Sequence, residues 1–355
     1  MELKTERHLA PPPTPSPSPR QQLMEMIHGY WVSQICGTTA RLRLADHFDN
    51  GPRTVAELAS LTSADPDGLG RLLRAGATVG LFTELEEDQF GLTSLGGELR
   101  IGDSAGSLGD FAIALTAPGR WLPFGYLFDA VVSGQPQARH ALGTDPWAYF
   151  ASHAEERSHF ARAMGSISVE ASAAVARQYD VSRFRRIVDV GASQGALLAG
   201  LLAAAPAASG VLFDLPEVVD GARDALSASS QADRVEFVGG DFFAQVPSGG
   251  DLYLLKSVLH DWDDKSALQI LRNIRRASVP GVTLAVIEGL LPSRPAPSPV
   301  HMANLMMLVA HGGRERTLEA YANLLAEAGF RLERAIPAPS GPFPWTVLEA
   351  VHQRI

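Results

Sequence analysis

The 355-residue chain has little cysteine and little lysine: Cys36 is its only cysteine, and Lys4, Lys256 and Lys265 are its only lysines. A single cysteine cannot form an internal disulfide, and it excludes a zinc site built from several cysteines. Acidic side chains outnumber basic ones by 39 to 30, which gives a formal charge of -9. Binding to nucleic-acid phosphates requires a basic surface, so we expect no nucleic acid as a partner.

Long hydrophobic runs are also missing. The most apolar stretch, Ala196–Ala205, is about half as long as the roughly 18 residues that a membrane-spanning helix needs, and Pro206 ends it. No basic segment leads into an apolar one near residue 1, so we expect no secretory signal. Together with the single cysteine, these absences predict a cytoplasmic protein without a membrane partner.

The chain does have enough apolar surface for a folded core, because 46% of its residues are hydrophobic, and its length is typical of about two domains. The exception is the first segment. Residues 10–19 read APPPTPSPSP, a composition that buries nothing and favours an extended chain. We therefore expect residues 1–20 to form a disordered, Pro-rich tail.

Residues 21–105 are expected to form a small helical domain with a winged-helix pattern. A first helix with an apolar stripe is predicted by five residues at helical spacing: Leu23, Met26, Ile27, Tyr30 and Trp31. Two short helices, joined by a turn at residues 65–67, follow it. A small β-wing that contains Phe82 and Phe90 comes next, which completes the winged helix-turn-helix pattern.

DNA-binding regulators share this pattern, but the charge of the segment favours another role. Residues 21–100 contain six arginines and eleven acids, and the expected wing carries Glu84, Glu86, Glu87 and Asp88. An acidic wing would repel the phosphate backbone that it had to contact. We therefore interpret the domain as a packing and dimerisation module and expect a homodimer. A winged-helix regulator remains the alternative from another functional class.

Residues 106–178 again have a helical pattern. We expect this segment to link the two halves of the chain and to line a substrate pocket. Trp121, Phe160 and Met164 are its candidate substrate contacts, although large apolar side chains of this kind are often ordinary core residues.

From residue 179 to residue 355, short apolar runs alternate with helical segments. Strands are predicted at residues 186–190, 210–214, 234–241, 251–256, 282–289, 330–336 and 345–351. Helices are predicted at Ala196–Ala204, Pro216–Ala228, Lys265–Ala277 and Thr317–Ala328. This alternation is typical of an α/β fold with a doubly wound, mostly parallel, Rossmann-like sheet. The last two strands have no helix between them, so we expect an antiparallel hairpin at one edge.

Polar residues accompany five successive predicted strands. They are Asp189 with the turn 191–195, Asp214, Asp241, His260 and Glu288. Ligands of open parallel sheets bind beyond the carboxyl ends of the strands, so these residues predict one shared site. The glycine turn allows a ligand to approach the backbone, Asp214 suits the two hydroxyls of a ribose, and Asp241 with Phe242 suits an adenine ring. The pattern indicates an adenosine-bearing cofactor.

The order and spacing of six motifs resembles one enzyme family. The motifs are VDVGASQGALL, VLFDLP, GGDFF, LLKSVLHDWDD, VIEGLLP and GGRERT. They are similar to those of S-adenosylmethionine-dependent O-methyltransferases of the plant caffeic-acid type and of bacterial natural-product biosynthesis, and the likeness extends from Gln21 to Val351. The resemblance implies S-adenosylmethionine as the cofactor and an aromatic or polyketide-like small molecule as the substrate.

The resemblance also implies roles for individual residues. The positions that match the family's cofactor contacts are Gly191, Asp214, Asp241, Phe242 and Lys256. His260 matches the general base, and Glu288 and Glu315 match the acids that flank it. Met307 and His311 complete the candidate substrate contacts.

A histidine suits this chemistry because a phenol or alcohol is a poor nucleophile until it loses its proton, and imidazole titrates near neutrality. Glu288 and Glu315 would orient the ring and stabilise its protonated form. This mechanism requires no metal, and we expect none. The nearby acids Asp261, Asp263 and Asp264 resemble a metal-binding cluster, but acids at this place are expected from the dipole of the helix that follows them.

The sequence departs from the family pattern in two places. Ala192 and Ser193 stand where glycines are usual, and Asn304 stands where an acid is common. The altered glycine turn leaves open an enzyme that binds the cofactor but catalyses a non-methylating step, such as hydroxylation, cyclisation or decarboxylation.

Two other enzyme classes share parts of the pattern. The turn 191–195 also spells the G-x-S-x-G of a hydrolase, with Ser193 as nucleophile and a late histidine such as His352 as base. That motif normally follows several strands, whereas here it follows the first. A nicotinamide dehydrogenase fits Gly191 and Asp214 but gives no role to His260 and its two acids.

Overall fold

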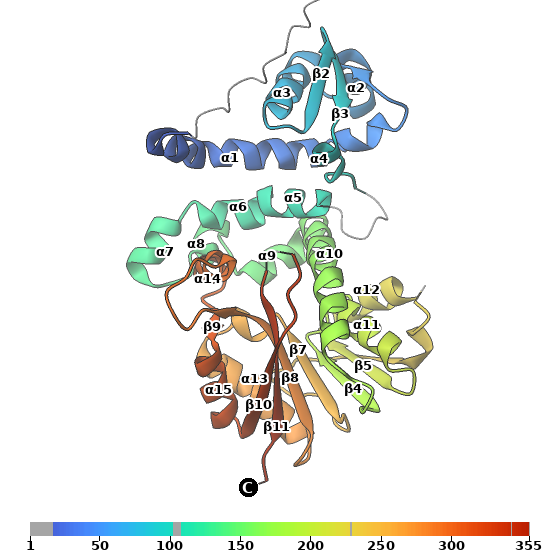
Figure 1. The fold of residues 1–355 in the computed structure, drawn as a ribbon, viewed down its shortest axis with the longest axis vertical. Helices are drawn as coiled ribbons and strands as arrows, with labels where there is room; N and C mark the ends of the chain where they lie inside the picture. The colour runs from blue at the N-terminus through green and yellow to red at the C-terminus, as the bar shows by residue number, and fades with distance from the viewer. Residues whose placement is uncertain (1–16, 102–107, 228, 342, 355) are drawn as a thin grey trace, which may run out of the picture.

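The computed structural model describes residues 17–101, 108–227, 229–341 and 343–354, and Figure 1 shows their arrangement. An N-terminal part made mainly of helices lies at one end of the molecule. A layer of short helices separates it from a large twisted sheet at the other end. The expected tail at residues 1–20 lies mostly outside the described residues, and the first helix begins within it, at Pro19.

The N-terminal part contains the helices and the hairpin that the sequence predicts. Its elements are α1 (Pro19–Arg41), the 3-10 helix η1 (Leu44–Phe48), β1 (Arg53–Thr54), α2 (Val55–Thr62), α3 (Pro66–Thr78), β2 (Phe82–Glu86), β3 (Gln89–Leu92) and α4 (Ser94–Gly97). The Asp65 carboxylate accepts a hydrogen bond from the Gly68 amide, and Pro66 fills the first turn, so α3 begins at the predicted turn. Phe82 and Phe90 are both buried against these helices.

The apolar stripe of α1 exists as predicted, but it faces away from the core of its own chain. Met26 is 75% exposed, Ile27 is 56% exposed and Trp31 is 51% exposed. The helix packs against α5 (Gly109–Thr116), and its buried residues, such as Ala40, lie near its C-terminal end. The stripe is therefore available to a partner.

The middle of the chain is helical, as predicted for residues 106–178 except for the first two, which lie outside the described residues. After α5 come α6 (Pro118–Phe124), α7 (Leu127–Ser133), α8 (Ala138–Leu142), α9 (Pro146–Ser152) and α10 (Ala154–Gln178). The long helix α10 packs against α5 at one end and against α11 (Ala196–Ala204) at the other, so it connects the N-terminal half to the sheet (Figure 1). No helix in the described part of the chain is long and apolar enough to cross a membrane.

The large sheet has the strand order β10-β11-β8-β7-β4-β5-β6. Its strands are β4 (Arg186–Val190), β5 (Ser209–Asp214), β6 (Val235–Gly239), β7 (Leu252–Lys256), β8 (Thr283–Leu291), β10 (Phe330–Pro337) and β11 (Trp345–His352). The strands from β8 to β6 are parallel, while β11 runs antiparallel to both β8 and β10. The predicted doubly wound sheet with an antiparallel hairpin at one edge is confirmed.

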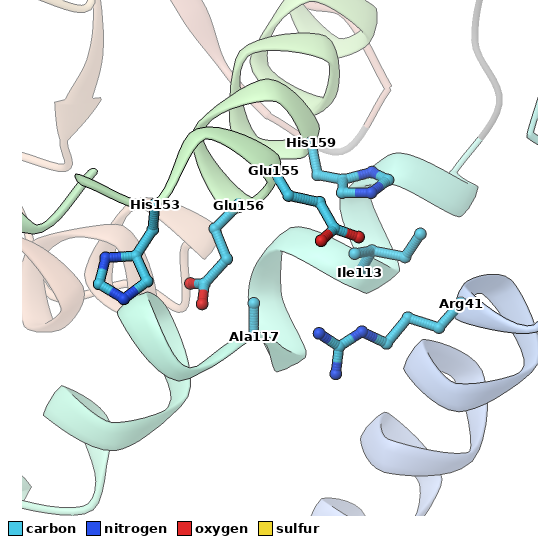
Figure 2. Close-up of a pocket in the computed structure, with 7 residues that line it drawn as sticks. All are labelled: Arg41, Ile113, Ala117, His153, Glu155, Glu156 and His159. Carbon is cyan, nitrogen blue, oxygen red and sulfur yellow. The ribbon is translucent and has the colours of Figure 1, made fainter. Parts of the chain in front are cut away.

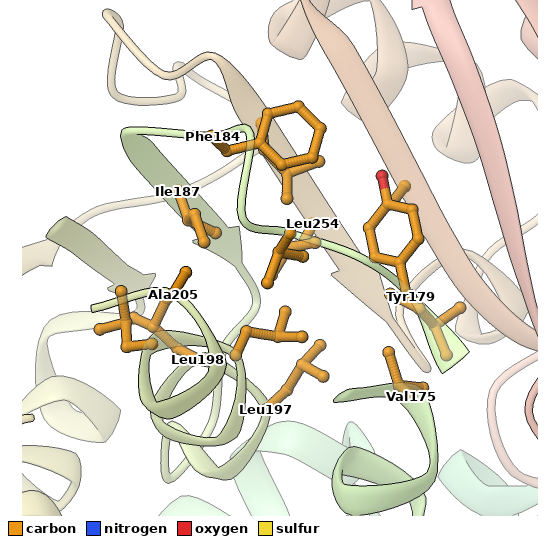
Figure 3. Close-up of a cluster of buried hydrophobic side chains, with 14 of the residues drawn as sticks. Val175, Tyr179, Phe184, Ile187, Leu197, Leu198, Ala205 and Leu254 are labelled. Atoms are coloured by element: carbon orange, nitrogen blue, oxygen red, sulfur yellow. The ribbon is translucent and has the colours of Figure 1, made fainter. Parts of the chain in front are cut away.

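Two apolar clusters cover the two faces of the sheet. One contains residues of α10, α11 and α12 (Pro216–Leu226) packed on Ile187 and Leu254, and Figure 3 shows Leu197 and Leu198 of α11 beside them. The other contains residues of α13 (Asp264–Ala277) and α15 (Leu318–Glu327) packed on Val188. Neighbouring residues of one strand point to opposite faces, so both clusters draw on the same strands. Each fully buried leucine contributes roughly 1.5–3 kcal/mol to folding.

Four further elements complete the structure. They are the 3-10 helices η2 (Ala232–Arg234) and η3 (Leu259–Asp261), the helix α14 (Pro299–Ala310) and the two-residue strand β9 (Arg316–Thr317). The predicted strand at residues 282–289 continues to Leu291, because β9 pairs with its last residues and Leu290 lies opposite Arg316. This pairing places Glu315 next to the end of β8, where Glu288 lies.

Candidate active site

One histidine and two glutamates meet at the carboxyl edge of the sheet. Nδ1 of His260 lies 2.8 Å from Oε1 of Glu315 and 3.6 Å from Oε2 of Glu288. Both glutamate side chains are fully buried, and that of His260 is 17% exposed. The structure therefore brings together the three residues predicted as the catalytic group.

Short-range backbone contacts hold the segment 313–316 against η3, which carries His260. The Arg314 amide donates to the His260 carbonyl oxygen at 2.8 Å, so the two segments lie in direct contact. A Cβ at Gly313 would lie 2.5 Å from the carbonyl carbon of Asp261, so only glycine allows this approach. The Glu315 amide donates to Oδ1 of Asn304, the residue that stands where the family often has an acid.

The side chain of Arg316 holds η3 in place through hydrogen bonds. Its guanidinium donates to the carbonyl oxygens of Leu259 and Trp262, each at 2.8 Å, and forms two hydrogen bonds to Oδ1 of Asp264. The side chain is almost completely buried. The residues on both sides of His260 are thus tied to the residue that follows Glu315. Sequence reasoning gave Arg316 no role, although the motif GGRERT contains it.

Glu288 has a structural task as well as its contact with His260. Its Oε1 accepts hydrogen bonds from the amides of Val258 and Leu259, at 3.2 and 3.0 Å, which anchors the turn before the histidine. Burial raises the pKa of Glu288 to about 7, despite the opposing charge of His260. Oε2 of Glu288 and Oε2 of Glu315 are buried without a hydrogen-bond partner in the described structure.

The surrounding acids decide the protonation of His260. Burial alone would lower the pKa of the imidazole, but Glu288, Asp261 and Glu315 outweigh it and raise the pKa to about 10. The N–H group at Nδ1 donates a hydrogen bond to Glu315 in the short contact. Nε2 makes no hydrogen bond with a described residue, and its nearest acid oxygen is Oδ1 of Asp261 at 3.6 Å. An acceptor hydroxyl can therefore approach Nε2.

The glycine turn after β4 lies beside these residues, as predicted. Gly191 has a φ of 72°, and a Cβ there would lie 2.8 Å from Cγ2 of Val258. Asp214, at the end of β5, accepts hydrogen bonds from the amides of Ser193 and Leu215 at 2.8 Å each. Burial raises the pKa of Asp214, and the two amides oppose the shift. The carboxylate is thus held in one orientation with lone pairs left for a ligand.

The remaining cofactor candidates lie around this turn. Asp241 is exposed, and its Oδ1 accepts a hydrogen bond from the Phe243 amide. The ring of Phe242 lies 3.8 Å from the position of a Cβ on Gly191, which places it against the turn. Lys256 donates to Oγ of Ser168 on α10 at 3.0 Å, and its Nζ lies 5.0 Å above the Trp345 ring.

Lys256 also interacts electrostatically with two buried acids, Asp189 of β4 and Glu288 of β8. Burial lowers its pKa, while the charges of Glu288 and Asp189 oppose that shift. Burial likewise raises the pKa of Asp189 to about 7, against the charge of Lys256, and Oδ2 of Asp189 has no hydrogen-bond partner in the described structure. The lysine is therefore the buried positive charge between two buried acids.

The predicted substrate contacts are only partly brought together. Phe160 and His311 both touch Arg120 of α6: its Cζ lies 4.3 Å from the Phe160 ring centroid, and its Nη1 lies 3.4 Å from Nε2 of His311. Trp121 and Met164 are partly exposed on α6 and α10, and Met307 is buried in α14. Sequence reasoning did not name Arg120, although an arginine within the apolar segment APGRWLPF is an unusual residue for a core.

Comparisons with known proteins agree with this arrangement over most of the chain. Residues 24–99 match the O-methyltransferase dimerisation domain, and residues 124–331 match the O-methyltransferase domain. Phenazine O-methyltransferase PhzM of Lysobacter antibioticus is 38% identical over 319 residues, which cover 90% of this chain and 93% of the relative. The chain belongs to the O-methyltransferase family. The family expected from the six motifs is therefore confirmed.

Solved structures extend the comparison to this methyltransferase's fold and cofactor. The crystal structure of LaPhzM has a TM-score of 0.89 at 37% identity and covers 94% of this chain and 99% of its own. NcsB1 from neocarzinostatin biosynthesis, in complex with S-adenosylmethionine and 2-hydroxy-5-methyl naphthoic acid, has a TM-score of 0.79 at 33% identity, over 90% of this chain and 96% of its own. The enzyme is a methyltransferase that uses S-adenosylmethionine.

The residues present in this methyltransferase fit that cofactor. The oriented Asp214 carboxylate can accept from ribose hydroxyls, and the close approach at Gly191 leaves no room for a side chain. The ligand atoms of His260, Glu288 and Glu315 lie within 4.8 Å of one another, which also suits a metal ion. The 2.8 Å contact between Nδ1 and Oε1 is a hydrogen bond, however, so we interpret the group as a proton-transfer site, and the absence of a metal stays a prediction.

The hydrolase alternative does not fit the fold of this methyltransferase. Ser193 follows β4 at the carboxyl edge of the parallel strands. His352 ends β11, whose residue Val351 pairs with Thr283 at the start of β8, so this histidine lies at the opposite edge. Its Nδ1 contacts Oγ of Ser278 at 3.0 Å. The two side chains cannot act together.

A cavity of about 250 Å³ lies apart from the candidate active site, between α1, α5 and α10 (Figure 2). It is lined by Arg41, Ile113, Ala117, His153, Glu155, Glu156 and His159. Glu156 accepts hydrogen bonds from the Gly119 amide and from the Tyr149 hydroxyl, so this wall fixes the start of α6 directly before Arg120. None of the predicted site residues lines the cavity.

Proposed function

We propose that this O-methyltransferase methylates a hydroxyl of an aromatic or polyketide-like small molecule, with His260 as the general base. The observation that carries the proposal is the asymmetry of the imidazole. Nδ1 is bound to Glu315 at 2.8 Å, while Nε2 has no hydrogen-bond partner among the described residues. A base needs one ring nitrogen held by an orienting acid and the other nitrogen open to its substrate.

The cofactor, when bound, would supply a methyl group on a sulfonium: an oxygen nucleophile would attack the methyl carbon in line, and the C–S bond would break to release the neutral thioether S-adenosylhomocysteine. Gly191, Asp214, Asp241, Phe242 and Lys256 are the residues that we assign to hold it. Asp214 would accept hydrogen bonds from the ribose hydroxyls, Phe242 would pack on the adenine ring, and Asp241 would accept a hydrogen bond from the adenine amino group. The positive charge of Lys256 balances the negative charges of the buried acids Glu288 and Asp189.

His260 then takes the proton of the acceptor hydroxyl on Nε2. Its raised pKa of about 10 lies close to the ordinary pKa of a phenol, which is also about 10. A proton moves between such partners at little cost. A phenol beside neutral imidazole and a phenolate beside imidazolium contain the same number of protons, so the complex can reach the reactive form without exchange with solvent. Glu315 and Glu288 stabilise the imidazolium that results.

The aromatic side chains near Phe160 and His311, two of the predicted substrate contacts, support an aromatic acceptor. Phe160 stacks with Phe150 at a centroid distance of 5.5 Å, and Trp147 stacks with His311 at 5.3 Å. Planar rings of this kind favour a planar ligand. The neighbour NcsB1 was solved with a hydroxylated naphthoic acid, and PhzM is named for phenazines, so both relatives point to the same class.

We further propose that the chain acts as a homodimer joined through residues 21–105, with residues 106–178 as the substrate segment and residues 179–355 as the cofactor domain. The match to a dimerisation domain supports this. So does the exposed stripe of α1, since a large apolar surface on a folded chain usually marks an interface. Its most exposed members are Leu23, Met26, Ile27, Tyr30 and Trp31.

The proposal is tested by incubating the protein with methyl-labelled S-adenosylmethionine and a panel of phenols and naphthols. Label should appear as an aryl methyl ether in the presence of wild-type protein and at a rate at least a hundredfold lower with His260→Ala. A product that is hydroxylated, cyclised or decarboxylated without label would instead identify a non-methylating enzyme. Label on nitrogen or carbon would contradict the oxygen acceptor.

A further inference from the structure

Arg120 is a cation that forms no ion pair with a described residue. It lies on α6, next to the residue whose amide is bound to Glu156. Its Nε is buried and has no hydrogen-bond partner in the described structure. None of the acids in the described ranges forms an ion pair with it, although the charge of Asp261 is near enough to oppose the lowering of its pKa by burial.

The groups that touch Arg120 leave its charge in place. The face of the guanidinium lies over the Phe160 ring, with 4.3 Å between Cζ and the ring centroid. Nη1 donates to Nε2 of His311 at 3.4 Å, since arginine has no acceptor. Burial lowers the pKa of His311 to about 4, so this partner is neutral at neutral pH and contributes no negative charge.

The contacts also show which donors of the guanidinium are left without a partner among the described residues. One face is covered by Phe160 and Nη1 is used by His311, so the remaining donors are Nε and Nη2, which form one edge. Such an edge presents two parallel N–H groups, which match the two oxygens of a carboxylate. A buried donor left unpaired is costly, so an anion at this edge would satisfy Nε as well as the charge.

The position of this edge relates it to the acceptor. Arg120 contacts His311, which lies two residues before Gly313, and Gly313 packs directly against the backbone of His260 and Asp261. Arg120 therefore lies close to the segment that carries His260. Phe160 offers a ring face next to the guanidinium for an aromatic ligand. We propose that Arg120 binds a carboxylate on the acceptor, so that the substrate of this enzyme is a hydroxylated aromatic acid. This inference rests on the proposed function, because it concerns the acceptor of the same site.

The test measures binding without chemistry. The protein is loaded with S-adenosylhomocysteine, and calorimetry compares 3-hydroxy-2-naphthoate with 3-hydroxy-2-naphthamide and 2-naphthol, and 4-hydroxybenzoate with 4-hydroxybenzamide. At least one acid should bind about ten- to a hundredfold more tightly than its amide, the gain expected of a charge-assisted pair. Arg120→Gln should abolish this preference while the Kd for S-adenosylhomocysteine stays within about twofold.

Two further variants separate charge from geometry. Arg120→Lys keeps the charge but lacks the two-pronged edge, so it should retain only part of the preference for the acid. Arg139→Gln removes an equal charge from α8, where the side chain is exposed and paired with Asp145, and it should leave the preference unchanged. The proposal is overturned if acids and amides bind equally, if no acid binds, or if Arg120→Gln retains the preference.

Failure of this inference is distinguishable from failure of the proposed function. If an acid binds through Arg120 but is never methylated, the carboxylate site stands and the reaction is wrong. If neutral phenols are methylated and acids gain nothing from Arg120, the reaction stands and the carboxylate site is wrong.

Discussion

Oε1 of Glu315 lies 2.8 Å from Nδ1 of His260, and this contact determines which nitrogen of the imidazole can meet a substrate. The glutamate is brought there by a two-residue strand, β9, that pairs with the end of β8. The acid and the histidine are 55 positions apart in the chain, so this contact forms only when the sheet is complete.

The first prediction concerns the pH dependence of the reaction. His260 must be neutral to accept a proton, and its pKa in the folded protein is raised to about 10 by the three acids that outweigh burial. Log kcat/KM should therefore rise with pH across the neutral range and level off only in the alkaline range. Glu315→Gln removes one of these charges, which lowers the pKa of His260 and moves the rising limb to lower pH, while the maximal rate falls because the ring loses its orienting acid.

This experiment has a matched control and a clear contradiction. Glu327→Gln neutralises an exposed glutamate of α15 that pairs with Arg272, and its profile should coincide with that of the wild type. The pH profile should be measured with two acceptors that differ in hydroxyl pKa. A rising limb at the same pH for both acceptors then reports the titration of the enzyme and not that of the acceptor. A limb that stays at the same pH in Glu315→Gln would contradict the account.

The second prediction concerns Arg316, which we treat as a positioning residue. Its bonds to the carbonyl oxygens of Leu259 and Trp262 hold the turn that carries His260. Arg316→Met should lower kcat with little change in KM for the cofactor, and should reduce the free energy of unfolding by about 3 kcal/mol, because it leaves buried partners unpaired.

A purely structural role would give a different result. Arg316→Lys retains the charge, so it should recover much of the stability, but it lacks the fork that binds both carbonyl oxygens and should recover little of kcat. If denaturant unfolding and kcat recover in parallel in Arg316→Lys, the positioning role is wrong.

The third prediction compares two carboxylates that both bind backbone amides. Asp214 accepts from Ser193 and Leu215 at the carboxyl edge of the sheet, and Asp251 accepts from Arg185 and Arg186 at the opposite edge. Asp214→Asn should raise the Kd for S-adenosylmethionine by roughly ten- to a hundredfold, since it removes charge-assisted bonds to the ligand. Asp251→Asn should lower stability but leave that Kd nearly unchanged. Equal effects of the two substitutions on the Kd would refute the assignment of Asp214.

The fourth prediction tests the exposed stripe of α1. Ile27 is 56% exposed on α1, and Leu61 is 53% exposed on α2, so the two side chains are matched in type and exposure. Ile27→Glu should convert a dimer into monomers in sedimentation velocity, because it places a charge within an apolar interface. Leu61→Glu should remain dimeric. A wild-type monomer, or a dimer that survives Ile27→Glu, would show that the stripe serves another purpose.

The sheet and its acids could be predicted because their signals are local. Each strand reads as a short apolar run, and a polar residue such as Asp214 stands at its end, so parallel order alone gathers these residues. The helix starts at Pro66 and Asp264 follow from capping residues in the same way.

Other parts of the structure depend on contacts between distant segments and leave no local pattern. Strand β9 is too short to show any periodicity, yet it positions Glu315. The sequence showed the stripe of α1 but not that the chain leaves it uncovered. Arg120 is one arginine in an apolar segment, and its missing counter-charge is visible only once Phe160 and His311 are placed around it.

The most direct test of the central claim is single-turnover methyl transfer by His260→Ala and the wild type, at saturating S-adenosylmethionine and with a naphthol acceptor. The account predicts a rate lower by about 10²–10⁴-fold in the variant, the range attributed to a general base, with an unchanged Kd for S-adenosylhomocysteine. The difference in rate between His260→Ala and the wild type should be smaller for an acceptor that is acidic enough to be ionised before it binds. A variant that transfers the methyl group at the wild-type rate to a weakly acidic naphthol would contradict the role of His260.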